Sequence, residues 1–189
     1  MTRGFEEQFE GNTIIKIREL LQRIESLNIN IPHGVSRYYR VDLSLCLEAG
    51  ALLGALHVAA SLLEITIREM VIEYAQEALP ENKKINLQKE LEEKRHLGFK
   101  SLVDELKAFE LFDPKDADLA KQFYNDIRIP IHHGLSRRFV SKHNDFMGIL
   151  EEASGGAYQT SMHDFERVIE EESLNLIETA IGIIERNKN

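Results

Sequence analysis

The sequence predicts an all-helical fold, an up-and-down bundle of about five helices. Apolar residues recur at spacings of three and four along most of the chain. Proline and glycine fall between these stretches, and no segment shows the period-two alternation of a half-buried strand. Because 189 residues suffice for one hydrophobic core, we expect a single domain over residues 1–189. It would have an N-terminal helix at about 12–28 and a core bundle at about 42–187.

The first two helices are predicted over residues 12–27 and from about Leu43 to Leu79. The first has an amphipathic pattern, and its apolar positions are Ile14, Ile17, Leu20, Leu21, Ile24 and Leu27. The segment between the helices holds Pro32 and Gly34 and ends in an irregular stretch at 36–40. Asp42 or Ser44 would cap the second helix, and Gly50 and Gly54 inside it each cost about 1 kcal/mol relative to alanine.

The remaining helices are predicted from caps and apolar stripes. A polar turn over 80–86 leads into a charged, solvent-facing stretch over 87–95, and a core stripe then runs from Phe99 to Phe109. Asp113 and Pro114 are a strong start for the next helix, for which Gly134 is the natural end. Its expected buried positions are Leu119, Phe123, Ile127 and Ile131. A loop over 144–160 precedes the last helix, capped by Thr160 or Ser161. Its expected core positions are Phe165, Val168, Ile169, Leu174, Ile177, Ile181 and Ile184.

Composition and charge disfavour several classes of protein. The net charge of −9 opposes a broad electrostatic grip on nucleic acid, although a compact nuclease site needs only a local cluster of cations. The uncharged run from Ala49 to Leu63 would span only about 22 Å as a helix, too short to cross a membrane. The single cysteine, Cys46, is interpreted as a buried thiol, and the first ten residues do not resemble a signal peptide. We therefore expect a soluble, cytoplasmic protein.

The most distinctive chemistry lies at the end of the fourth predicted helix, from Arg128 to Gly134. Pro130 should bend or loosen this helix, because its ring conflicts with the carbonyl of Asp126. In a straight helix His132 lies about 40° from Arg128 and His133 about 140° away, which favours His132 as its neighbour. A kink could turn His133 to the arginine instead. Candidate phosphate-binding cations come next in the chain, at Arg137 and Arg138.

The second predicted helix carries a polar stripe, in which His57, Ser61, Glu64 and Arg68 are spaced four, three and four residues apart. If the stripe faces the fourth helix, Glu64 could orient Arg128, because a buried charge is tolerated only when it is paired. The alternative is an internal pair between Glu64 and Arg68 on an exposed face, with His57 as an ordinary core histidine. The sequence leaves both interpretations open.

The pattern of arginine, four residues and histidine at Arg128–His133, closed by Gly134, resembles the HEPN superfamily. It lies late in a helical bundle, behind a long helix rich in alanine and leucine. The segments Ala59–Glu64 and Ile127–Gly134 together resemble a stand-alone group of HEPN domains without an assigned function. The resemblance covers roughly residues 40–187 in helix order.

This resemblance implies a HEPN-like bundle that forms a two-fold homodimer, in which both copies of the motif meet in one cleft. In many members this cleft cleaves RNA without a metal ion or other cofactor. Arg128 and His133 would be the catalytic residues, with His132, Glu64 and His57 in support. RNA would then be the substrate, and the protein could be a toxin or an anti-phage effector, with an antitoxin or another defence-system protein as its partner.

Two other functions remain open on the sequence alone. A non-catalytic dimeric binding or regulatory module is favoured by the acidic net charge and by Ile129, which stands beside the motif arginine where active members often have a polar residue. A metal site built from His57, His132, His133 or Glu64 is disfavoured, because these histidines lack the spacing of a zinc-binding helix.

Overall fold

The computed structural model describes residues 4–27, 35–78, 98–129 and 162–187. Side chains are described only up to Tyr74 in the second range and only from Glu172 onwards in the last. All regular structure in these ranges is helical, as predicted. The elements are α1 (Phe5–Gln8), α2 (Asn12–Ser26), α3 (Ser36–Glu48), α4 (Leu52–Ala78), α6 (Phe99–Ala108), α7 (Pro114–Phe123), the π turn η1 (Tyr124–Arg128) and α10 (Met162–Asn187). This part of the chain alone holds seven α-helices, so the expected number of about five is not confirmed.

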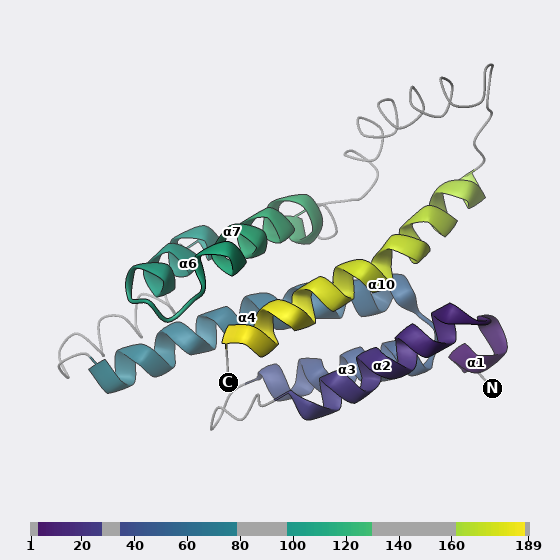
Figure 1. Ribbon diagram of the computed structural model, residues 1–189, viewed down its shortest axis with the longest axis horizontal. Coiled ribbons are helices and arrows are strands. Elements are labelled where there is room, and N and C mark those ends of the chain that lie inside the picture. Colours follow the sequence, from purple (N-terminus) through teal and green to yellow (C-terminus); the bar gives the residue numbers. More distant parts are fainter. Residues whose placement is uncertain (1–3, 28–34, 79–97, 130–161, 188–189) are drawn as a thin grey trace, which may run out of the picture.

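Helices α4 and α10 run side by side through the middle of the described structure (Figure 1). Helices α2 and α3 pack on one side of this pair, whereas α6 and α7 pack nearer the other end of α4. Helix α4 contacts α3, α6, α10 and η1, which makes it the element that links the two groups. In the described ranges no helix is both long enough and apolar enough to traverse a bilayer.

The expectation of one helix from Leu43 to Leu79 is wrong, because the helix is interrupted between Glu48, where α3 ends, and Leu52, where α4 begins. Gly50 has a φ of +70°, a left-handed conformation that glycine adopts without steric cost. A Cβ at this position would also lie 2.9 Å from the side-chain amide of Gln8. That amide donates to the carbonyl of Ala49 at 2.9 Å, so α1 closes the break.

Helix α3 begins at Ser36, earlier than expected, and neither Asp42 nor Ser44 caps it. Its N-terminal donors are instead met by Glu69 of α4, whose Oε1 accepts from the backbone N–H of Val35 at 2.7 Å and of Ser36 at 3.2 Å. A carboxylate at this position also suits the positive end of the helix dipole. The stretch predicted to be irregular is therefore helical because a distant residue caps it.

The first and last predicted helices are confirmed within a residue or two. Four of the expected positions are buried, Ile17, Leu20 and Ile24 in α2 and Leu27 at its C-cap. Helix α10 buries four of its expected positions, Leu174, Ile177, Ile181 and Ile184. The side chains of Phe165, Val168 and Ile169 lie outside the description, as do the predicted turn at 80–86, the stretch at 87–95 and the loop at 144–160.

Helix α7 starts as predicted but buries a different face. Asp113 accepts from the backbone N–H of Lys115 at 2.8 Å and of Asp116 at 3.2 Å, with Pro114 at the first helical position. The buried residues are Asp116, Ala117, Ala120 and Phe123. Leu119 was expected in the core but is 36% exposed. It lies about 100° around the helix from the centre of the face on which Ala117, Ala120 and Phe123 are buried.

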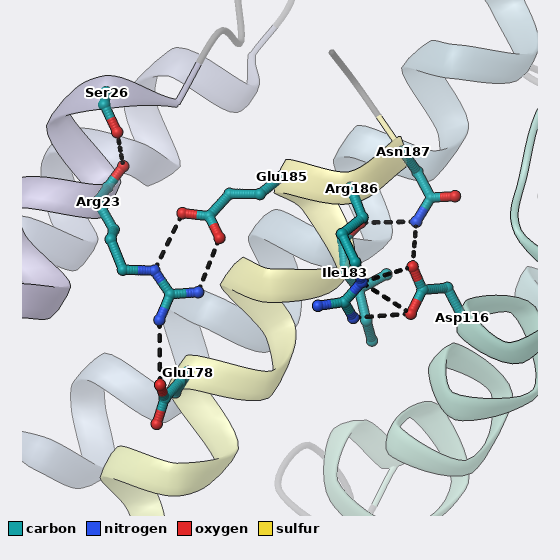
Figure 2. A network of polar contacts seen from close by, with 8 residues as sticks. All are labelled: Arg23, Ser26, Asp116, Glu178, Ile183, Glu185, Arg186 and Asn187. Atoms are coloured by element: carbon teal, nitrogen blue, oxygen red, sulfur yellow. Dashed lines mark hydrogen bonds and ion pairs between the residues drawn. The ribbon is translucent and has the colours of Figure 1, made fainter.

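Two polar clusters attach α10 to the helices on either side (Figure 2). Arg23 of α2 forms a bidentate pair with Glu185, at 3.0 and 2.7 Å, and reaches Glu178 at 3.1 Å. On the other side, Arg186 and Asn187 donate to Asp116 of α7, each at 2.7 Å in the shortest contact. These hydrogen bonds, led by that from Arg186, hold the pKa of Asp116 below its ordinary value.

We expect Asp116→Asn to lower the free energy of unfolding by about 1 kcal/mol at pH 7, since Arg186 is partly exposed and its charge is screened. The pKa of Asp116 is lower in the folded state, so the stabilisation is present above the unfolded pKa and is lost as pH falls through the folded one. Urea denaturation should therefore show that the difference in unfolding free energy between wild type and variant is smaller near pH 2 than at pH 7. Asp118→Asn, at a carboxylate that is 73% exposed, is the control. A gap of the same size at both pH values would contradict this account.

Candidate functional site

The motif helix changes its winding just before the proline. Residues Tyr124–Arg128 form a π turn, in which the N–H of Ile129 donates to the carbonyl of Tyr124, five residues back. The sequence predicted a loosening around Pro130, and the described helix loosens in the turn that precedes it. Pro130 itself lies outside the described residues.

The π turn changes the direction in which the later side chains of the motif helix point. Ala117, Ala120 and Phe123 define the buried face of α7. If the α-helix continued, Ile127 would lie about 20° from the centre of that face and Arg128 about 80° from it. A π turn holds one extra residue and rotates the residues after it back by about 100°, which places Arg128 near the centre instead. Both side chains are half-buried in the structure.

Arg128 points to α4, where it meets the polar stripe. Its Nε donates to Oε2 of Glu64 at 2.9 Å, and the two side chains are 20% and 15% exposed. The other carboxylate oxygen, Oε1, accepts from Nη2 of Arg68 at 3.0 Å and from Nε of the same residue at 3.3 Å. The structure therefore contains both contacts that the sequence had left as alternatives. Glu64 bridges two arginines, and the three side chains together carry a net charge of +1.

His57 lies about two helical turns before Glu64 on α4 and is also half-buried. Burial lowers the pKa of its imidazole, and the positive charge of Arg128 lowers it further. His57 is therefore neutral at pH 7, a state in which one ring nitrogen can accept a hydrogen bond and the other can donate one. Ser61, the fourth residue of the stripe, is half-buried as well.

The other candidate residues lie outside the described part of the chain. These are His132, His133, Arg137 and Arg138. Among the described residues, no three histidine, cysteine, aspartate or glutamate side chains come together in a way that could hold a metal ion. The site that the structure describes thus consists of Arg128 with the α4 residues His57, Glu64 and Arg68.

Sequence reasoning missed the π turn and did not expect Glu64 to contact Arg68 and Arg128 at the same time. The π turn has no recognisable signal beyond the proline after it. Arg68 was considered only as a competitor for Glu64, although its i, i+4 spacing on the same helix is a sequence signal for the contact that it makes.

We expect deletion of Asn125 to preserve the contact between Glu64 and Arg128. Removing one residue from a π turn restores an ordinary α-helix and leaves the later residues facing the same way. Insertion of one alanine after Tyr124 should turn Arg128 by a further 100° or so and break the contact. The measurement is the loss of unfolding free energy caused by Glu64→Gln in each background.

That loss should be similar in the wild type and the deletion variant, and smaller in the insertion variant, where Glu64 keeps only its contact with Arg68. Equal losses in all three backgrounds would show that the π turn does not set the direction of Arg128.

Comparisons of the chain with protein-family models, with curated proteins and with solved structures find no match.

Proposed function

We propose that this protein is a metal-independent endoribonuclease of the HEPN type, acting as a two-fold homodimer in whose cleft two copies of Arg128 and His133 meet. The observation that carries the proposal is the arginine of the motif, half-buried and held by Glu64 across the interface between two helices. An arginine fixed in this way is oriented before substrate arrives, which lowers the entropic cost of binding an oxyanion.

The chemistry that we propose is a transesterification within RNA. The 2′-oxygen forms a bond to the adjacent phosphorus, and the bond from phosphorus to the 5′-oxygen breaks. His133 of one protomer takes the proton of the 2′-hydroxyl, and His133 of its partner gives a proton to the departing 5′-oxygen. Arg128 stabilises the negative charge that develops on the phosphate. The products are a 2′,3′-cyclic phosphate and a 5′-hydroxyl end.

Arg128 supports this role through the donors that it keeps. Glu64 engages only its Nε, and the structure records no partner for Nη1 or Nη2 among the described residues. These two nitrogens form an edge that can bind a phosphate with two parallel hydrogen bonds. Because His57 is neutral, it adds no further positive charge beside Arg128.

The experiment is cleavage of RNA by the purified protein in the presence of EDTA, with analysis of the product ends. We expect 5′-hydroxyl and cyclic phosphate ends, formed by the wild type and by Arg18→Ala but not by Arg128→Ala. Arg18 is a suitable control because it lies on α2 and is 59% exposed, in an ion pair with Glu6. Equal cleavage by all three proteins would point to a contaminating nuclease and would reject the proposal.

A second candidate is a non-catalytic dimeric module of the same fold, which binds RNA or a nucleotide through the same residues. The residue after Arg128 favours this candidate, because it is the apolar Ile129 where active members of the HEPN superfamily often have a polar residue. Binding of RNA that depends on Arg128, without any cleavage, would select it.

A further inference from the structure

Arg68 of α4 contacts Glu64 and takes no part in the proposed chemistry. Its Nε and Nη2 both donate to the same carboxylate atom, Oε1 of Glu64, at 3.3 and 3.0 Å. Arg128 reaches only the other oxygen, Oε2, and does so through Nε. The carboxylate is thus divided between the two guanidinium groups, one oxygen to each.

A carboxylate that meets a single arginine tends to bind it with both oxygens, in two parallel hydrogen bonds. Such a pair would occupy Nε and one terminal nitrogen of Arg128. An oxyanion would then have to compete with Glu64 for that terminal nitrogen. In this structure Arg128 makes a single hydrogen bond to Glu64, at Oε2, and Oε1 accepts from Arg68 instead. Arg68 is well placed for this contact, since it lies one helical turn from Glu64 and is only 28% exposed.

We propose that Arg68 is a positioning residue, which keeps the terminal nitrogens of Arg128 open to a phosphate by holding one oxygen of Glu64. This inference deepens the proposed function and rests on it for the identity of the phosphate as that of RNA. The binding of a phosphate group by Arg128, however, can be measured without any cleavage.

Arg68 could act on phosphate binding in two ways, through its positive charge alone or by holding Glu64. If Arg68 acted only through its charge, its removal would weaken phosphate binding by the same factor whether or not Glu64 is present. If it acts by holding Glu64, its removal should matter only while residue 64 is a carboxylate. A double-mutant cycle of Arg68→Gln and Glu64→Gln separates the two.

The experiment measures the Kd of inorganic phosphate by titration calorimetry for the full chain. We expect Arg68→Gln to raise Kd by about tenfold, and Arg68→Lys, which can still donate to Oε1, to stay within about threefold of the wild type. In the Glu64→Gln background, Arg68→Gln should change Kd by less than about twofold. Arg18→Gln is the control for the loss of one exposed positive charge elsewhere.

Equal effects of Arg68→Gln in the two backgrounds would overturn the proposal, as would a wild type that binds no phosphate. Circular dichroism of each variant, together with the lysine substitution, guards against loss of the fold as the cause. For RNA, Arg68→Gln should raise KM more than it lowers kcat, because the affected step is the binding of a phosphate. If phosphate binding shows the expected pattern and RNA is not cleaved, the ribonuclease proposal fails while the role of Arg68 stands.

Discussion

Replacing His133 with alanine is expected to lower kcat for RNA cleavage by about 10²–10⁴-fold, the usual contribution of a side chain that transfers protons in the transition state. His132→Ala should lower kcat far less, although straight-helix geometry places that residue nearer to Arg128. The two substitutions are matched, because they remove the same side chain from neighbouring positions. The measurement is the single-turnover rate of cleavage of an RNA oligonucleotide in EDTA.

The same substitution tests whether two chains share one cleft. If one His133 acts as base and its partner as acid, a dimer with one mutant chain is inactive. A mixture of equal parts wild type and His133→Ala, after subunits exchange, should then keep about one quarter of the activity. About one half would remain if each chain worked alone. Full activity of the His133→Ala homodimer would remove that residue from the mechanism altogether.

Phe99→Ala is expected to have the largest effect on stability, a loss of about 3–5 kcal/mol of unfolding free energy. Phe99 is 1% exposed, and its ring stacks on that of Tyr124 at a centroid distance of 4.4 Å with 8° between the planes. Tyr124 is the first residue of the π turn, which orients Arg128. The stack therefore attaches this turn to α6. Urea denaturation measures the loss.

Phe109→Ala is the matched control, because this phenylalanine ends the same helix and is 46% exposed. It also contacts an aromatic ring, that of Tyr74 at 4.5 Å, so the two variants differ mainly in burial. We expect a loss below about 1 kcal/mol for Phe109→Ala. Similar losses for the two variants would show that the stack on Tyr124 is not anchored in the core.

Much of the fold could be predicted because its signals are local. The start of α7 depends on Asp113 and Pro114, which are neighbours in the chain and act on the first turn of their own helix. The core faces of α2 and α10 are predicted by apolar residues repeated at helical spacing, and burial in the structure agrees with that pattern. A short-range cause leaves a short-range mark in the sequence.

The errors arose where a distant residue decides a local conformation. Helix α3 starts at Ser36 because Glu69, on the next helix, accepts from its first N–H groups. The break before α4 is closed by Gln8, which lies 41 residues from the carbonyl that it binds. Propensity alone rates Gly50 as a modest cost inside a helix, whereas in the structure its φ of +70° lets the N–H groups of Gly50 and Ala51 donate to the carbonyls of Leu47 and Cys46, which ends α3.

The candidate site divides in the same way. The sequence by itself determined the polar stripe of α4 and the position of Arg128 ahead of a proline, because residue identity and spacing suffice for both. Only the tertiary structure decided that Arg128 turns towards Glu64 and that Arg68 shares its carboxylate. The physical reason is the π turn, whose one extra residue rotates the side chains of the motif helix, and helical spacing cannot reveal such a rotation.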